Sequence, residues 1–394
     1  MKDFSKRVKD IEVSLIRYMP VLASKVPDTV SLGQGLPSFE LPEEIKEKLI
    51  EALRTIKDIN KYSLEPGLPI LKEEVAKYLE KTKNVKINPE KEICITKGAI
   101  GGLFCTISSL IEKGDEVILL TPAYEPHIEQ VKFAEGKPIF VPLIEKLGWR
   151  PNFDAIDSSI TKKTKAIIIC DPSNPTGGVF EKEDLKKIAD LANKFDLFII
   201  TDETYDFLTY DEKEHFSLLS FPEVRDRLIA CFSFSKKYAM TGFRVGYVVS
   251  PENIMNQILK VHDESTICAP TISQYAALFA LTSPQNFVQK FKEEFQKRRD
   301  LICQRLDQLK DLFEYQKSKG AYYIFPKLKL PIKSKDFSLK LLYKAKVITI
   351  PGIAFGPSGE GHIRLSFAGK EKDINEAFNR IEEFWINLKK TFKL

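Results

Sequence analysis

Short apolar runs rich in β-branched residues alternate with amphipathic stretches between about residues 90 and 250 of this 394-residue chain. Residues 183–194, for example, place their apolar side chains on one face at helical spacing. Strands that alternate with helices form crossover units, which set the strands side by side in a parallel sheet. We therefore predict an α/β fold with a mostly parallel central sheet flanked by helices. The predicted strands are residues 93–96, 117–120, 166–169, 197–200, 228–231 and 245–249.

The pattern changes beyond Pro284. A long charged helical stretch at residues 287–312 precedes apolar runs at 321–325 and 347–350 and a final helical stretch near residues 370–389. We predict that this part forms a smaller α+β domain. The turn-rich start of the chain fits neither pattern, and we expect it to pack against the C-terminal part. The predicted division is residues 1–44 for the N-terminal segment, 45–285 for a large domain and 286–394 for a small C-terminal domain.

The charge distribution and hydropathy exclude several classes of protein. Lys and Arg number 60 against 55 for Asp and Glu, and the two signs are mixed along the chain, so nucleic acid is not an expected partner. No apolar run is long enough to span a bilayer, and the N-terminus lacks the apolar core of a signal peptide. We therefore expect a cytoplasmic protein with no membrane partner.

The six cysteines and four histidines are scattered along the chain. No pair stands at metal-ligand spacing, and the cysteine pattern is not that of a disulfide framework. We expect the cysteines to be reduced and mostly buried, and we predict that no metal is bound. We expect all four histidines to be structural or solvated: His127, His215, His262 and His362.

Residues able to do chemistry follow the predicted strands, and in parallel sheets such positions gather at the edge where ligands bind. After the first strand, the small residues at 98–102 open a helix whose free backbone N–H groups suit a phosphate. Glycines that permit close helix packing explain this stretch equally well. Asn174 lies in a proline-rich turn after the third strand. Asp202 follows the fourth strand, with Tyr205 three residues further on.

The stretch after the fifth strand, residues 233–246, brings together two serines, a lysine and an arginine. Singly, these site residues have plain explanations: Asn174 forms a turn, Asp202 caps a helix, and Lys236 lies on the surface. Together and in this order, a phosphate site, an acid, a phenol and an amine meet the needs of pyridoxal phosphate. The aldehyde of that cofactor requires an amine, and its ring nitrogen requires an anion.

The pattern Ser-Lys-x-x-x-Met-Thr-Gly-x-Arg-x-Gly at residues 235–246 resembles the class I/II aminotransferases of fold type I, the aspartate-aminotransferase-like superfamily. The resemblance runs from about Leu32 to the last helix. It implies that Lys236 binds pyridoxal 5′-phosphate covalently and that Arg244 binds the phosphate as a bidentate fork. The other phosphate contacts that it implies are Ser233, Ser235 and the turn of Gly98, Ala99 and Ile100.

The resemblance also implies the remaining cofactor contacts. Asp202 pairs with the pyridine nitrogen and thereby stabilises the protonated ring. Tyr205 and Asn174 hydrogen-bond the 3′ oxygen, and Tyr124 stacks on the face of the ring. The catalytic residues implied are Lys236, Asp202 and Tyr205.

Further segments resemble the parts of this family that bind substrate and join subunits. Tyr62 resembles the tyrosine offered to the phosphate of the neighbouring subunit, which implies a homodimer with shared active sites. Gly35 resembles the substrate-side backbone turn and, like Asn174, is expected to contact substrate. Arg364 resembles the arginine that clamps the substrate α-carboxylate.

The predicted function is a transaminase that moves an amino group from an L-amino acid to a 2-oxo acid. The turn at residues 33–37 also resembles relatives that act on aromatic amino acids, kynurenine or methionine. Two positions depart from the family, because Ile100 carries no side-chain donor and Tyr124 stands where many relatives have tryptophan. No motif marks a second arginine for an acidic side chain, so acidic substrates are not favoured.

Two alternatives remain open from the sequence. The cofactor-binding residues alone do not decide the fate of the substrate carbanion, so a C–S lyase or an enzyme like aminocyclopropane-carboxylate synthase could share this scaffold. A non-enzymatic alternative is the effector domain of a transcription regulator. The region of resemblance starts near Leu32, which leaves no room for the DNA-binding module that such regulators carry ahead of it.

Overall fold

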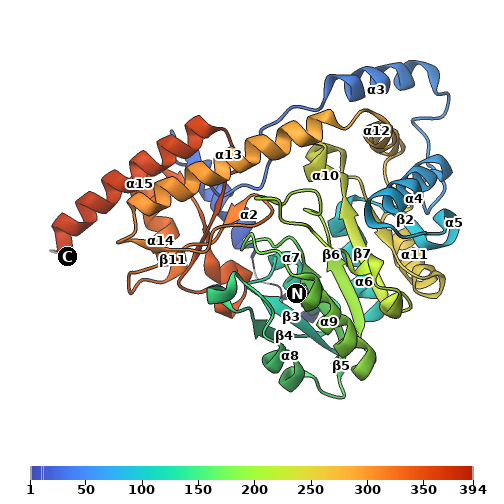
Figure 1. The fold of residues 1–394 in the computed structure, drawn as a ribbon, viewed down its shortest axis with the longest axis horizontal. Helices are drawn as coiled ribbons and strands as arrows, with labels where there is room; N and C mark the ends of the chain where they lie inside the picture. Colours follow the sequence, from blue (N-terminus) through green and yellow to red (C-terminus); the bar gives the residue numbers. More distant parts are fainter. Residues whose placement is uncertain (1, 10, 12, 393–394) are drawn as a thin grey trace.

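A computed structural model of the chain describes residues 2–9, 11 and 13–392. At its centre lies a seven-stranded sheet, whose strands are β2 (Ile93–Thr96), β3 (Glu116–Thr121), β4 (Lys137–Pro142), β5 (Thr164–Cys170), β6 (Phe198–Asp202), β7 (Leu228–Ser233) and β8 (Gly246–Val249). Their order is β2-β8-β7-β6-β5-β3-β4 (Figure 1). Strand β8 runs antiparallel to both of its neighbours, and all other neighbouring pairs are parallel. The predicted α/β fold with a mostly parallel sheet is confirmed.

The middle residues of the central strands are apolar on both faces because helices cover both faces of the sheet. In β5, Ile167 and Ile169 join the core on one face, whereas Ala166 and Ile168 join the core on the other. This alternation follows from the two-residue period of side chains along a strand. The helices of this part are α3 (Glu43–Thr55), α4 (Pro69–Lys83), α5 (Pro89–Glu92), α6 (Gly98–Leu110), α7 (Glu125–Phe133), α8 (Phe153–Ser159), α9 (Lys182–Phe195), α10 (Phe234–Lys237), α11 (Glu252–Thr266) and α12 (Thr271–Thr282). Short helical turns are η1 (Glu145–Leu147), η2 (Leu218–Ser220), η3 (Pro222–Val224) and η4 (Thr241–Phe243).

A second apolar core lies where the two ends of the chain meet, beneath the long helices α13 (Asn286–Gln308) and α15 (Glu371–Phe392), which lie side by side (Figure 1). Helix α13 ends before the predicted residue 312, because Leu309 and Leu312 turn into this core. The other elements here are β9 (Phe313–Glu314), β10 (Tyr323–Ile324), β11 (Lys327–Leu328), α14 (Ser334–Lys340), η5 (Leu341–Ala345), β12 (Val347–Ile348), β13 (Ile350–Pro351), η6 (Gly352–Phe355), η7 (Pro357–Gly359) and β14 (Ile363–Ser366).

The start of the chain contributes α1 (Lys6–Lys9), α2 (Leu15–Ala23) and β1 (Val30–Ser31). Helix α2 and strand β1 contact the C-terminal part, whereas α1 contacts α7. Strand β1 pairs in parallel with β12, through Val30 and Val347. The domain boundaries at residues 44/45 and 285/286 stay a prediction. Within the described residues, no helix has both the length and the apolar character needed to cross a bilayer.

Candidate functional site

A cavity of about 330 Å³ opens at the carboxyl ends of β5, β6 and β7. Parallel strands end here together, which is where α/β sheets bind ligands. The cavity brings together most of the site residues predicted from the sequence: Gly35, Ala99, Ile100, Tyr124, Asn174, Asp202, Tyr205, Ser233, Ser235, Lys236, Arg244 and Arg364. Gly98 and Tyr62 are the two predicted residues that do not line it.

Lys236 projects into the cavity from α10, which begins directly after β7. The hydroxyl of Ser233 accepts a hydrogen bond from the backbone N–H of Ser235 at 3.1 Å and caps this short helix. The Nζ of Lys236 donates to the backbone carbonyl of Gly35 at 2.8 Å. Burial, together with the positive charges of Arg244 and Arg364, lowers the pKa of Lys236 to about 8. The uncharged form of this amine is therefore much more abundant near neutral pH than in an ordinary lysine.

Asp202 is the last residue of β6 and is buried. Its Oδ1 accepts hydrogen bonds from the hydroxyl of Thr204 at 2.6 Å and from the Thr204 backbone N–H at 3.1 Å. Its Oδ2 lies 3.1 Å from the Nε2 of His127. Burial alone would raise the pKa of Asp202, but its contacts with His127 and Thr204 hold that pKa below its ordinary value. The cavity therefore contains a carboxylate that stays ionised.

His127 is a residue that the sequence analysis missed. It is buried, yet it contacts Asp202 and stands edge-on to the ring of Tyr124, with centroids 5.4 Å apart. The expectation that all four histidines are structural or solvated is therefore incomplete for His127. Its position three residues after Tyr124, on the same face of α7, was the available signal.

An anion site surrounds the guanidinium of Arg244. This residue adopts the left-handed conformation, with φ +53°, and its Nη1 donates to the backbone carbonyl of Thr241 at 2.8 Å. The first residues of α6 face it: a Cβ on Gly98 would lie 2.9 Å from Nη2 of Arg244. Gly98 thus borders the site through Arg244 without lining the cavity itself. Free N–H groups at a helix start, together with a guanidinium, suit a phosphate.

Arg364 lies on the opposite side, on β14, with 2% of its surface exposed. Its Nη1 donates to the Oδ1 of Asn174 at 3.0 Å, and its Nη2 donates to the backbone carbonyl of Gly33 at 2.5 Å. Its Nε has no hydrogen-bond partner among the described residues. The ring of Tyr323 lies against the guanidinium, 4.5 Å from the centroid. This buried fork is suited to a ligand carboxylate.

Tyr323 of β10 lines the cavity, and the preceding residue, Tyr322, contacts the cavity residue Gly35. The sequence analysis placed both only in an apolar run. The hydroxyl of Tyr323 lies 2.9 Å from the hydroxyl of Tyr205, and Tyr322 donates to the carbonyl of Gly35 at 2.9 Å. Burial raises the pKa of Tyr205 well above its ordinary value, so its hydroxyl is a neutral donor. A Cβ on Gly35 would lie 1.9 Å from the Tyr323 hydroxyl oxygen, so the close contact between the Gly35 backbone and the Tyr323 side chain requires glycine.

Tyr62 does not reach the cavity within one chain. Its side chain is 78% exposed and lines a separate surface hollow of about 710 Å³ with Lys61, Lys97 and Thr271 among its neighbours. The described residues include no cluster of three or more histidine, cysteine or acidic side chains that could hold a metal ion.

Comparison with known proteins places this site in a family. The family model described as aminotransferase class I and II matches residues 27–381. The chain is 38% identical to an aspartate aminotransferase of Pyrococcus abyssi, over 96% of this chain and 97% of that one. It is 36% identical to aromatic-amino-acid aminotransferase 2 of Thermococcus litoralis, over 96% and 97%.

A solved structure agrees with these relatives. The aspartate aminotransferase of Thermus thermophilus with maleate superposes with a TM-score of 0.91, is 32% identical, and covers 97% of this chain and 99% of that chain. The sequence match and the fold therefore extend over nearly the whole chain. The chain belongs to the class I and II aminotransferases.

Proposed function

We propose that this aminotransferase uses pyridoxal 5′-phosphate to move an amino group from an L-amino acid to a 2-oxo acid. The observation that carries the proposal is the position of Lys236. A buried amine with a pKa of about 8 shares one cavity with the carboxylate of Asp202 and the guanidinium groups of Arg244 and Arg364. The cofactor requires an amine for its aldehyde, an anion for its ring nitrogen and a cation for its phosphate, and an amino acid requires a second cation for its α-carboxylate.

The chemistry of these groups fits the cofactor. Arg244, Ser233 and Ser235, with the start of α6 at Gly98–Ile100, would hold the phosphate. Asp202 would face the ring nitrogen, and Tyr124 would lie against the ring. Asn174 and Tyr205 would donate to the 3′ oxygen, since the buried Tyr205 keeps its proton. The orphaned Nε of Arg364 supports the presence of a further ligand on the substrate side.

When bound, the cofactor withdraws electrons from the substrate Cα and so makes its proton removable. The uncharged form of the Lys236 Nζ accepts that proton as a general base, and its lowered pKa of about 8 makes this form far more abundant than in an ordinary lysine. Asp202 stays ionised through its contacts with His127 and Thr204. Its negative charge would stabilise the positive charge of a protonated ring nitrogen. Arg364 orients the substrate by its α-carboxylate, so that the Cα proton faces the lysine.

We also propose that the enzyme is a homodimer in which Tyr62 reaches the phosphate site of the partner subunit. The position of Tyr62 supports the proposal, because its side chain is exposed beside a surface hollow and does not line the cavity of its own chain. We place the enzyme in the cytoplasm, since all six cysteines are free thiols, as in reducing compartments.

A half-reaction tests the proposed function. The purified holoenzyme is mixed with single amino acids in the absence of a 2-oxo acid, and the products are quantified. Aspartate, phenylalanine, tyrosine, kynurenine and methionine form the panel, since the resemblance and the named relatives point to different donors. Stoichiometric pyridoxamine phosphate and 2-oxo acid support transamination. Catalytic release of ammonia or pyruvate from any of these donors would instead identify a lyase.

A further inference from the structure

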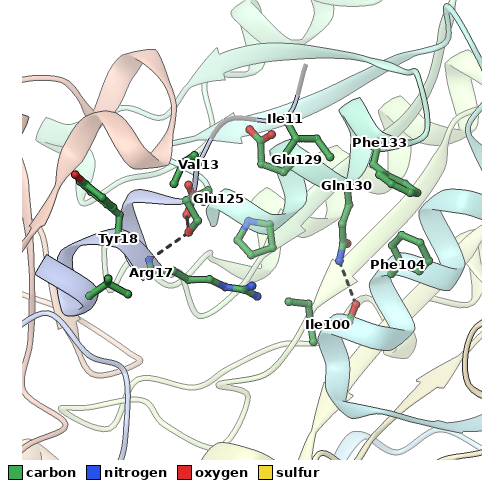
Figure 2. Close-up of a pocket in the computed structure, with 13 residues that line it drawn as sticks. Ile11, Val13, Arg17, Tyr18, Ile100, Phe104, Glu125, Glu129, Gln130 and Phe133 are labelled. Carbon is green, nitrogen blue, oxygen red and sulfur yellow. Dashed lines mark hydrogen bonds between the residues drawn. The ribbon is translucent and has the colours of Figure 1, made fainter. Parts of the chain in front are cut away.

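Arg17 is a cation for which the proposed function supplies no partner. Its side chain lines the cofactor cavity and also a second cavity, of about 490 Å³, beside it. Figure 2 shows this side chain extending from α2 toward Ile100 at the start of α6. Within the described part of the chain, the guanidinium makes no ion pair and no hydrogen bond. An unpaired guanidinium at the mouth of a cavity attracts an anion.

The charges in the cavity indicate which anion is left for it. In the proposed function, the phosphate pairs with Arg244, the substrate α-carboxylate with Arg364, and the ring nitrogen with Asp202. Arg17 is therefore a positive charge in the cavity wall to which the proposed function assigns no anion. The side chains that line the cofactor cavity beside it are apolar, which strengthens its attraction for an anion: Ile16, Ile100 and Leu103.

Two carboxylates line the second cavity, and both have other partners. Glu125 accepts hydrogen bonds from the hydroxyl of Ser14 at 2.5 Å and from the backbone N–H of Leu15 at 3.2 Å. It therefore anchors the first turn of α2, the helix that carries Arg17. Glu129 pairs with Lys132 at 2.9 Å. Among the described residues, neither carboxylate forms an ion pair with Arg17, but Glu125 anchors the start of the helix that carries that arginine.

We propose that Arg17 is a specificity-determining residue that binds a second carboxylate at the far end of the substrate side chain. Glu125 is the positioning residue that holds Arg17 in place through α2. The substrate class is then dicarboxylic amino acids and 2-oxo acids. This inference rests on the proposed function, and it reverses the expectation from the sequence that acidic substrates are not favoured. Arg17 lies in no motif, so only the fold brings it to the site.

Paired ligands test this assignment in the holoenzyme. Succinate and butyrate have the same four-carbon chain and differ by one carboxylate, and each is titrated by its effect on the cofactor absorbance. Wild-type enzyme should bind succinate more tightly than butyrate. In Arg17→Gln, the Kd for succinate should rise about tenfold or more, the effect of losing a charge-assisted pair, while the Kd for butyrate stays within about twofold.

Matched variants identify the origin of the effect. Arg7→Gln removes an arginine from the same N-terminal segment that lines neither cavity, and it should change neither Kd. Glu125→Gln weakens the anchor of α2 and should shift the succinate Kd in the same direction by a smaller factor. Arg17→Lys should recover part of the preference for succinate, because it restores the charge without the fork.

Two results would overturn the inference. Equal binding of succinate and butyrate by the wild-type enzyme would do so, as would an equal loss of both ligands and of cofactor in Arg17→Gln, which would make Arg17 a cofactor contact. A different result would contradict the proposed function without affecting this inference. If no amino acid in the panel yields pyridoxamine phosphate while succinate still outcompetes butyrate through Arg17, the transaminase assignment is wrong and the carboxylate site stands.

Discussion

The Nζ of Lys236 donates a hydrogen bond to the backbone carbonyl of Gly35 at 2.8 Å, joining residues 201 positions apart in the sequence. Gly35 follows β1, which pairs with β12 of the C-terminal part, whereas Lys236 lies on α10 at the edge of the large sheet. This contact therefore joins the N-terminal segment to the large sheet at the cavity. A carbonyl here orients the amine without adding a charge that would raise its pKa.

The backbone turn at Gly35 should not tolerate a side chain. In Gly35→Ala, the new methyl group would overlap the buried hydroxyl of Tyr323, so we expect the free energy of unfolding to fall by about 1–3 kcal/mol. The value of kcat/KM should fall as well, because Tyr323 contacts Tyr205. Denaturant unfolding and steady-state kinetics measure both effects. Gly369→Ala, where a Cβ meets nothing within 4 Å, is the matched control and should be nearly neutral.

The ionisation of Lys236 should set the pH dependence of cofactor capture. Its pKa of about 8 lies below that of an ordinary lysine, so the uncharged, reactive amine predominates above pH 8 and is lost as the pH falls. The rate at which apoenzyme forms the lysine-bound chromophore should rise with pH and level off above about 8. Arg364→Gln removes a nearby positive charge and should move the midpoint upward. A wild-type midpoint above 10 is incompatible with this description.

Asp202→Asn should retain the cofactor and lose turnover. The amide keeps much of the hydrogen bonding to Thr204 but cannot stabilise a protonated ring, so we expect kcat to fall about 100-fold or more, or about 3 kcal/mol of barrier. Absorbance of the bound cofactor and single-turnover kinetics separate binding from chemistry. Thr204→Val leaves the carboxylate in place and should cost far less. Turnover close to wild type in Asp202→Asn removes this residue from its role.

Tyr62 should act across the subunit interface. Tyr62→Phe removes a contact to a charged phosphate and should weaken cofactor retention by about 1.5–3 kcal/mol. Mixed dimers of Tyr62→Phe and Lys236→Ala subunits place both defects in one shared site and leave the other intact. At limiting cofactor, such dimers should exceed both parents in activity and reach about half of the wild-type value. A fully active monomer in light scattering contradicts the shared site.

Much of the fold and site could be predicted because it is encoded locally. The strands follow from short apolar runs, and Asn174, Asp202 and Lys236 stand at or within a few residues of the carboxyl ends of strands that end together. The contacts of His127 and Arg17 could not be predicted in this way. His127 reaches Asp202 across 75 positions, and Arg17 reaches the cavity because α2 packs against β12 and β13 and its start is hydrogen-bonded to Glu125. Such pairings depend on tertiary packing, which single-sequence periodicity does not contain.

Tertiary packing also sets element boundaries that differ from those predicted from the sequence. Residues 347–350 form one apolar run in the sequence, yet the chain divides it between β12 and β13, which pair with different partners. Strand β12 meets the N-terminal segment, and β13 meets β14 beside Arg364. The hydropathy of these residues predicts that they are buried. It does not predict which strand each of them pairs with.

The central claim, that Lys236 carries the cofactor, is tested most directly by reducing the holoenzyme with borohydride and mapping the labelled peptide. Borohydride makes the link between lysine and cofactor permanent, so the modified residue is identified by mass. The neighbouring Lys237 is an internal control, because its Nζ instead contacts the hydroxyl of Tyr78 at 2.6 Å. We predict a single label on Lys236, absent from Lys236→Ala and retained in Lys237→Ala. A label on Lys237, or a labelled Lys236→Ala variant, would contradict the account.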